Sequence, residues 1–338
     1  MKKQSPFIAA IFFALMLSAS CQGKDGKMDN STAHSSISDS LRKVRRVKNN
    51  IIEKHLCLAD IGLKGKVKVM STTAYSMQGS DGEKVFKSKG YSMFDEKGNL
   101  LETGYDKPDG KPDVKFRFRY DAKGNDTASG YYSPEGALLG RTYVQYDEHG
   151  NEITEISYDR EGHISRRTVF KYDDKDNLVE LVNYNDRNKA EGRATYQYDV
   201  NGFKNEAAIF DEQDKPNGRA TFKYNDRGDL LEIVSYNKEN KQEGKTTYKR
   251  DDKGRKTERQ AYNATGNMTD KQTYTYDTAG NMTEERSYAA DGSPDVAANI
   301  YYEYVYDTAG NIIKSTKYEM NNGKRMATET EEATYSYY

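Results

Sequence analysis

Short stretches in which every second side chain is apolar or aromatic recur along most of the chain. Residues 194 to 198, for example, read Ala-Thr-Tyr-Gln-Tyr, and this period of two predicts a β-strand with one buried face. A polar turn follows, with Asp199 where a type I turn favours aspartate and Gly202 where φ must be positive. The pattern predicts two antiparallel strands joined by a tight hairpin.

This hairpin unit repeats with a period of 26 residues. With the last residue of the first strand as position zero, the first eight copies have at this position Phe94, Tyr120, Tyr146, Tyr172, Tyr198, Tyr224, Arg250 and Tyr276. A ninth copy begins at Tyr306, after a step of 30 residues. An aspartate or asparagine follows every time, glycine stands at plus four except at Asp176, and eight copies carry an aromatic residue at plus twelve. A fixed period of this length is typical of a repeat architecture.

The tight turn also predicts how the two strands pair. Position zero should lie opposite plus six, and minus two opposite plus eight. This register places plus six, eight, ten and twelve on the same face as the aromatic residues at zero and minus two. Nine repeats predict about eighteen strands in one sheet. Because strands twist, this sheet should curl or wind. The expected fold class is all-β: an antiparallel β-hairpin repeat array, curled as a single solenoid-like sheet in which each hairpin covers the next.

The unit Tyr-Asp-x-x-Gly-Asn, followed by a short strand and a second aromatic residue, resembles the Rhs or tyrosine–aspartate (YD) repeat family. The best copies are Tyr146–Tyr158, Tyr276–Tyr288 and Tyr306–Tyr318, and the resemblance covers about Phe94 to Tyr318. It implies an extended β-sheet that coils, and a link to carbohydrate binding and the bacterial cell surface. The large toxins of this family coil the sheet into a hollow shell. With far fewer repeats and no toxin domain before Tyr338, a closed shell around a toxin is not expected here.

Some copies depart from the family pattern. The copy at Phe94 has its second aromatic residue, Tyr105, one place early, and the copies at Tyr198 and Tyr224 lack the asparagine of the turn. The copy at Arg250, which also carries Arg255 in place of that asparagine, departs most. We interpret these copies as degraded.

The N-terminal segment predicts export and lipidation. Residues 1–20 begin with a positive pair, Lys2-Lys3, and continue with an apolar stretch too short to span a bilayer. Residues 17 to 21 read Leu-Ser-Ala-Ser-Cys, which resembles the lipobox of bacterial lipoproteins, with Ser18 where leucine is usual. We therefore expect lipidation of Cys21 and a place in the cell envelope, in the outer membrane of a Gram-negative bacterium, with the lipid as the only membrane contact. An ordinary cleaved secretory signal is the alternative.

Three segments are expected between the signal and the repeats. Residues 21–37 are small and polar, as in a flexible tether. Residues 38–64 show a weak helical pattern that predicts a short helix and lead-in. Residues 65–93 alternate around a Gly-Ser-Asp-Gly turn and predict an initial β-hairpin. The repeats then occupy residues 94–338.

Composition excludes several classes of function. The chain of 338 residues has 52 basic and 53 acidic side chains, so it lacks the basic surplus of a nucleic-acid-binding protein. Its two cysteines give no disulfide framework, and its four histidines include no close pair with metal-ligand spacing. No Gly-x-Ser-x-Gly motif is present. We expect no cofactor, no metal, no catalytic residues and no nucleic-acid partner.

Two columns of side chains point to ligand binding. The first, at plus eight, comprises Glu102, Glu180, Glu206, Glu232, Glu258 and Glu284. The second, at minus two, includes Phe170, Tyr196, Phe222, Tyr248 and Tyr274. The predicted register sets them side by side, and carboxylates beside aromatic faces suit a carbohydrate, so the candidate ligand-binding residues are Tyr196, Phe222, Tyr248, Glu206, Glu232 and Glu258. Alternatively, each glutamate bonds a tyrosine hydroxyl or a neighbouring Lys or Arg and is purely structural.

The leading functional hypothesis is a binding or scaffold module of the envelope for an extended ligand, polysaccharide or protein. The competing hypothesis is a purely structural or protein-interaction lipoprotein without a small ligand, in which the aromatic column is inaccessible core. A glycan-acting enzyme comes third, because adjacent ladder carboxylates share identical surroundings whereas catalysis needs two differently tuned groups.

Overall fold

The computed structural model describes residues 62–78, 82–107 and 109–338, which form twenty β-strands and no helix. The strands are β1 (Val67–Gln78), β2 (Glu83–Phe94), β3 (Leu100–Asp106), β4 (Pro112–Tyr120), β5 (Asp126–Tyr132), β6 (Leu138–Tyr146), β7 (Glu152–Asp159), β8 (Ile164–Tyr172), β9 (Leu178–Asn185), β10 (Ala190–Tyr198), β11 (Lys204–Phe210), β12 (Pro216–Tyr224), β13 (Leu230–Tyr236), β14 (Gln242–Arg250), β15 (Lys256–Asn263), β16 (Met268–Tyr276), β17 (Met282–Tyr288), β18 (Pro294–Tyr306), β19 (Ile312–Asn321) and β20 (Lys324–Tyr337). The predicted signal, Cys21, the tether and the predicted helix up to residue 61 lie outside the described residues.

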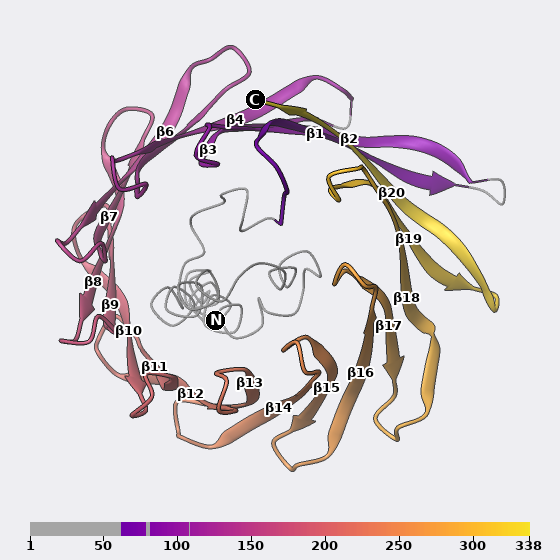
Figure 1. Cartoon of the computed structure of the whole chain (residues 1–338). Coiled ribbons are helices and arrows are strands. Elements are labelled where there is room, and N and C mark those ends of the chain that lie inside the picture. Colours follow the sequence, from indigo (N-terminus) through magenta and orange to yellow (C-terminus); the bar gives the residue numbers. More distant parts are fainter. Residues whose placement is uncertain (1–61, 79–81, 108) are drawn as a thin grey trace, which may run out of the picture.

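The antiparallel hairpins predicted from the sequence are confirmed, but the sheet does not stay open. The nine repeats account for β2 to β19, and β1 and β20 are two further strands. These two pair with each other, with Val67 opposite Tyr337 and Ser76 opposite Glu329. Figure 1 shows the resulting closed ring of strands. The prediction of an open, solenoid-like sheet is therefore wrong, because closure gives the backbone groups of both edge strands a partner.

The register within each hairpin differs from the prediction by one residue. Position zero does lie opposite plus six, as Tyr198 opposite Lys204 shows. The pairing then shifts, so that Gln197 lies opposite Glu206 and Tyr196 opposite Ala207. The same shift occurs in all nine repeats. A β-bulge at plus seven explains it, since a bulge opposes two residues on one strand to one on the other.

The bulge separates the predicted single face into two. Positions minus four, minus two, zero, plus six and plus nine share one face, whereas minus five, minus three, minus one, plus eight, plus ten and plus twelve share the other. The chain enters β1 from inside the ring (Figure 1), and Leu63 in that segment packs against Phe94 and Leu100, which occupy positions zero and plus six. The first set therefore forms the inner face of the ring, and the second set forms the outer face.

The inner face carries the main buried cluster. It extends over β8 to β13 and comprises Phe170, Leu178, Ala194, Tyr196, Ala207, Phe222, Leu230 and Ile233. Each large apolar side chain buried in this way stabilises the fold by about 1.5–3 kcal/mol. The cluster therefore makes a large contribution to holding neighbouring hairpins together.

Tyrosine hydroxyls at position zero tie five of the repeats to the one before. The hydroxyl of Tyr172 donates to the carbonyl of Glu152 at 2.8 Å, and that of Tyr198 donates to the carbonyl of Leu178 at 2.8 Å. Equivalent bonds join Tyr120, Tyr146 and Tyr276 to carbonyls twenty residues earlier. Tyrosine suits position zero because its ring packs on the inner face while its hydroxyl satisfies a backbone acceptor.

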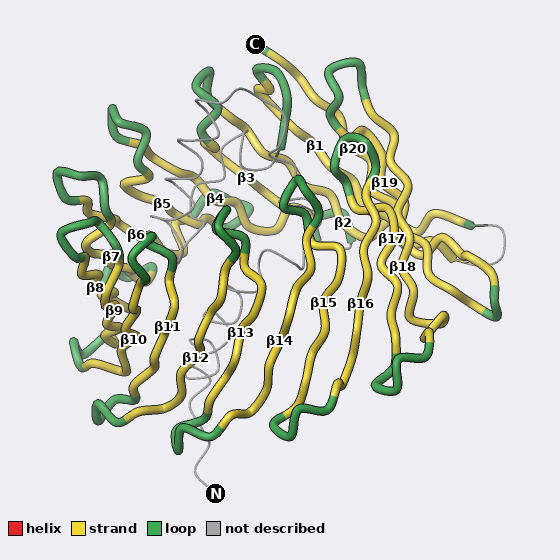
Figure 2. Tube along the Cα trace, turned by 60° about the horizontal axis from the view of Figure 1, so that its bottom comes forward, coloured by secondary structure: helices red, strands yellow, loops and turns green. Residues whose placement is uncertain are grey.

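The turns after position zero pack against one another along one rim of the ring, and Figure 2 shows turns at both rims. Within a turn, Asp173 accepts bonds from the backbone amides of Lys175 and Asn177 at 2.9 and 2.8 Å. Between turns, the ring of Phe203 covers Gly228, where an added Cβ would lie 2.6 Å from a ring carbon. Gly228 therefore meets two demands, a positive φ and the close approach of the preceding turn.

Candidate functional site

The three aromatic candidates lie on the inner face. Tyr196 and Phe222 are each only 5% exposed within the main cluster, and Tyr248 packs against it. Burial raises the pKa of Tyr196 and that of Tyr248 above the ordinary value for tyrosine. The rings of Tyr196 and Phe222 are therefore part of the packed interior, and the ring of Tyr248 is partly buried against it.

The three glutamate candidates lie on the outer face and are paired with cations. Glu206 accepts a bond from Arg219 at 3.1 Å, and Glu232 pairs with Lys223 at 2.7 Å. Glu258 lies 2.7 Å from the Nζ of Lys249 and 3.0 Å from that of Lys271.

Partial burial acts to raise the pKa of Glu258, but the hydrogen bonds from the two lysines hold it below its ordinary value. These three glutamates thus pair with a neighbouring Lys or Arg, as the structural alternative predicts. The expectation that the glutamates lie beside the aromatic column is wrong, because the β-bulge moves plus eight to the opposite face.

The outer face instead carries a different row of aromatic residues, each covered by a cation. In six consecutive repeats the basic residue at minus five lies opposite the aromatic residue at plus twelve. The pairs of this cation–aromatic row are Arg141/Tyr158, Arg167/Tyr184, Arg193/Phe210, Arg219/Tyr236, Lys245/Tyr262 and Lys271/Tyr288. The signal was present in the sequence, since eight of nine copies have Lys or Arg at minus five, but only the correct register places it over the ring.

Two members of the row show how firmly the cations are held. The guanidinium carbons of Arg193 and Arg219 lie 3.8 Å from the centres of the Phe210 and Tyr236 rings. At this distance a cation over a ring contributes on the order of 0.5–2 kcal/mol. The Nε of Arg219 also donates to the Oδ1 of Asn240 at 2.7 Å. The guanidinium of Arg219 thus lies against the ring of Tyr236, and the bond to Asn240 fixes its position.

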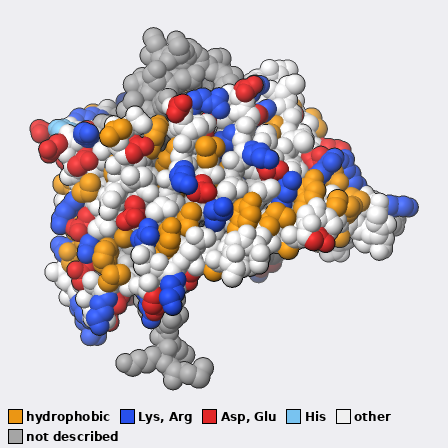
Figure 3. Space-filling model, turned by 90° about the horizontal axis from the view of Figure 1, so that it is seen from below, with side chains coloured by type: hydrophobic (Ala, Val, Ile, Leu, Met, Phe, Trp, Pro, Cys, Tyr) orange, Lys and Arg blue, Asp and Glu red, His pale blue; other side chains and the backbone are white. Residues whose placement is uncertain are grey.

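The outer face has a surplus of positive charge in several repeats. Lys171, Lys223 and Lys249 occupy minus one and have side chains 65%, 74% and 72% exposed. Each of these repeats has a second cation at minus five and a single glutamate at plus eight. Figure 3 shows one side of the molecule, with Lys and Arg interspersed among acidic and hydrophobic side chains. Equivalent positions in successive repeats are two strands apart, or about 9.6 Å.

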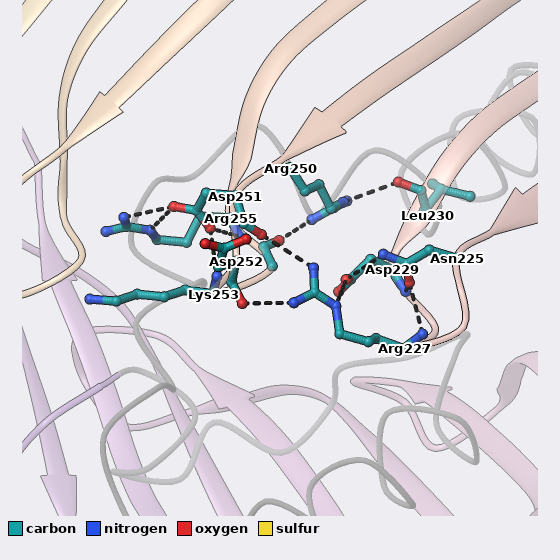
Figure 4. Close-up of polar contacts among 10 residues, drawn as sticks. Asn225, Arg227, Asp229, Leu230, Arg250, Asp251, Asp252, Lys253 and Arg255 are labelled. Atoms are coloured by element: carbon teal, nitrogen blue, oxygen red, sulfur yellow. Dashed lines mark hydrogen bonds and ion pairs between the residues drawn. The ribbon is translucent and has the colours of Figure 1, made fainter.

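The repeat at Arg250 keeps the contacts of its neighbours with different residues. The Nε of Arg250 donates to the carbonyl of Leu230 at 3.1 Å, where other repeats use a tyrosine hydroxyl. The Nε of Arg255 donates to the Oδ2 of Asp251 at 2.7 Å, in place of the asparagine amide. Figure 4 shows these arginines with Arg227, which donates to backbone carbonyls of the same turn. This repeat is altered in sequence but preserved in its hydrogen bonding.

Among the described residues, no group of three or more His, Cys, Asp or Glu side chains is placed to hold a metal ion. Within the same residues, no helix is long and apolar enough to cross a membrane. Burial raises the pKa of Glu285, whose carboxylate accepts a bond from the Nε2 of Gln272 at 2.6 Å.

The comparisons with known proteins establish no family. No protein-family model matches the chain, and no curated protein matches it. A porin-like protein from Bacteroides uniformis is 12% identical, with a TM-score of 0.36, over 81% of this chain and 98% of that one. The TcdB2–TccC3 toxin without its hypervariable C-terminal region is 12% identical, with a TM-score of 0.27, over 72% of this chain and 16% of that one. The Tc holotoxin pore of Photorhabdus luminescens is 11% identical, with a TM-score of 0.25 and the same coverage. The chain thus spans about a sixth of the toxin chains it matches.

Proposed function

We propose that this protein is a non-enzymatic binding module of the cell envelope whose outer face binds an extended acidic polysaccharide. The observation that carries the proposal is the cation–aromatic row, which repeats the same chemical unit in six consecutive repeats on one face. A repeated unit suits a polymer, because weak contacts at successive units add through multivalency.

The covering of the aromatic rings by cations favours an acidic polymer over a neutral one as the ligand. A sugar that stacks needs a free aromatic face, but in this row Arg193 and Arg219 already cover the rings of their partners. The side chains that face outward are therefore cations, with exposed lysines beside them. Guanidinium groups held in a fixed plane are suited to carboxylate or sulfate groups.

The test measures binding of the purified protein to polygalacturonate and, as the neutral comparison, to dextran. Binding to polygalacturonate should be saturable and weaken with added salt, since salt screens exposed charges. A triple variant, Arg193→Gln, Arg219→Gln and Lys245→Gln, should weaken binding about tenfold or more because three neighbouring units are lost.

A control variant removes the same charge elsewhere. Lys215→Gln, Lys238→Gln and Lys253→Gln change exposed lysines outside the row and should leave the affinity within about threefold. Equal losses in the two triple variants, or dextran binding as strong as polygalacturonate binding, would refute an outer-face site for acidic polymers.

A purely structural envelope protein is the second candidate. It is favoured by the inaccessibility of Tyr196 and Phe222, each 5% exposed, which the structural hypothesis requires. It is also consistent with the pairing of the outer glutamates. Absence of binding to acidic polymers, neutral polymers and envelope proteins would leave this function in place of the first.

A further inference from the structure

The outer face is hollowed where the first repeat departs from the others. Plus twelve in this repeat is Asp106 instead of an aromatic residue, and plus ten is Gly104. The ring of Tyr91 lies over Gly104 so closely that an added Cβ would be 2.6 Å from a ring carbon. The result is an open hollow of about 390 Å³ between β1, β2 and β3. Small-molecule sites are typically about 300–1,000 Å³ in volume.

Apolar side chains line one wall of the hollow, and a hydrogen-bonded polar group lines another. Val69 and Met93 provide the apolar part. The hydroxyl of Tyr91 donates to Glu102 Oε1 at 2.5 Å, and the Nε of Arg117 donates to Glu102 Oε2 at 2.6 Å. Burial, with the bond to Glu102, raises the pKa of Tyr91 to about 12, so the phenol stays protonated. The charge of Glu102 is therefore already balanced by Arg117.

Two further charged groups line the hollow, and the charge of one of them, Asp106, also helps to raise the pKa of Tyr91. Lys89 at minus five and Asp106 at plus twelve lie next to the paired residues Gly90 and Tyr105, so they face each other across β2 and β3. Neither side chain makes a hydrogen bond or an ion pair with any described residue. In six of the later repeats the basic residue at minus five instead covers an aromatic ring, as Lys245 covers Tyr262 at 4.7 Å. The first repeat thus presents a cation and a carboxylate that face each other beside an apolar surface, with no aromatic ring between them.

We propose that this hollow binds a free α-amino acid with an apolar side chain. The ammonium of the ligand pairs with Asp106, its carboxylate pairs with Lys89, and its side chain lies against Val69 and Met93. A ligand with both charges satisfies both groups, whereas a simple anion meets the repulsion of Asp106 and a neutral sugar leaves both charges unpaired. Charge-assisted hydrogen bonds of this kind are roughly twice as strong as neutral ones.

The test titrates leucine into the purified full chain and follows the heat released. Three related probes each remove one feature: isocaproate lacks the ammonium, leucinamide lacks the carboxylate, and glucose lacks both charges and the apolar chain. Leucine should bind saturably, and isocaproate and leucinamide should each bind about tenfold more weakly or worse, since each leaves one charge of the hollow unpaired. No saturable leucine binding, or binding of glucose in its place, overturns the proposal.

Matched variants locate the site. Lys89→Gln and Asp106→Asn should each weaken leucine binding about tenfold, and both change partly or fully exposed side chains. Lys245→Gln, at the same register position in a repeat that keeps its aromatic residue, should leave leucine binding unchanged. An equal loss with Lys245→Gln overturns the location. The outcome is independent of the polysaccharide proposal, which depends on Lys245 and its neighbours and not on Lys89.

Discussion

Single residues in this protein take different roles according to the face that they occupy. Lys204 is at plus six on the inner face, where the flanking repeats have Leu178 and Leu230. It is 2% exposed, and its Nζ lies 5.0 Å from the centre of the Phe222 ring and 5.5 Å from that of Tyr196. Burial lowers its pKa from 10.5 to about 8, because removal from water disfavours the charged form.

Lys204→Leu should therefore stabilise the protein at neutral pH. The folded-state pKa lies below the unfolded value, so the unfolded chain binds more protons between about pH 8 and 10.5, and stability rises with pH in that window. Below pH 8 the buried lysine is charged. The attraction of the two rings for a cation offsets part of the free-energy cost of burying that charge. We expect the variant to raise the free energy of unfolding at pH 7 by about 2 kcal/mol and to lose the rise between pH 8 and 10.

Urea unfolding at pH 7 and pH 9 checks this expectation, with Lys223→Leu on the exposed outer face as the control. A loss of stability in Lys204→Leu at pH 7 would show that the rings favour the cation more than burial disfavours it.

For single residues, the sequence predicts which side chains recur in each repeat but not which of them contact one another. The alternation of residues 194 to 198 correctly placed Tyr196 and Tyr198 on one face. The glutamates were assigned to the wrong face because a single bulged residue reverses the side of every later position in a strand. A bulge leaves no composition signal of its own here, since plus seven is variable, with Asn205 and Leu231 among its residues.

At the scale of the element, the turn depends on glycine at plus four for two separable reasons. Gly228 has a φ of 81°, and an added Cβ would lie 2.6 Å from the ring of Phe203. Gly150 has a similar φ of 85°, but nothing lies within 4 Å of its added Cβ. The two positions therefore share the backbone strain and differ in the contact.

Gly150→Ala should cost about 1 kcal/mol of stability from the left-handed backbone alone. Gly228→Ala should cost about 1–3 kcal/mol more, because the ring of Phe203 must move from its position stacked on Tyr224. Thermal unfolding of both variants measures the difference. The extra cost should vanish when Gly228→Ala is combined with Phe203→Ala and compared with Phe203→Ala alone; a persistent extra cost would place its origin in the backbone.

The hairpin and its turn were predictable because their signals are local. Aspartate at plus one and glycine at plus four specify the turn within five residues, and the tyrosine at position zero marks the strand before it. For the same reason the sequence alone predicts that the repeat at Arg250 is degraded. The sequence shows that Arg250 replaces tyrosine, but only the structure shows that its Nε reaches the same carbonyl as the lost hydroxyl.

At the scale of the whole molecule, the closing pair of strands decides the architecture. Thr72 and Ala333 lie directly opposite each other in β1 and β20. Opposed antiparallel residues have Cα atoms about 4.5–5.5 Å apart, within the reach of a disulfide.

A Thr72→Cys and Ala333→Cys pair, in a chain whose two native cysteines are replaced by serine, should form a disulfide under mild oxidation. The oxidised form should be more stable than the reduced form by about 2–4 kcal/mol, because the bond closes a very long loop. Migration under non-reducing conditions and thermal unfolding measure the two effects. A mismatched pair, Thr72→Cys with Thr168→Cys, should stay reduced; disulfide formation in both chains alike would argue against a closed ring.

Closure could not be predicted from any single repeat. An open sheet would leave unpaired edges near Val67 and Tyr337, but whether these two strands meet depends on the curvature summed over all the strands between them. Each hairpin contributes a small bend, and the nine bulges each add local twist. Closure of the ring thus depends on the curvature of the whole sheet and not on that of any single hairpin.

The pairing of β1 with β20 also restricts how such a gene can evolve in length. An open array can gain or lose a unit by unequal recombination at little cost, since each unit contacts only its neighbours. In this protein a duplicated unit of 26 residues would add two strands to a circumference that already meets, and a deleted unit would leave a gap. A change in copy number therefore requires the curvature of the other hairpins to adjust before the ring can close again. Substitutions within a copy need no such adjustment, since the Arg250 copy makes the hydrogen bonds of its neighbours with different residues.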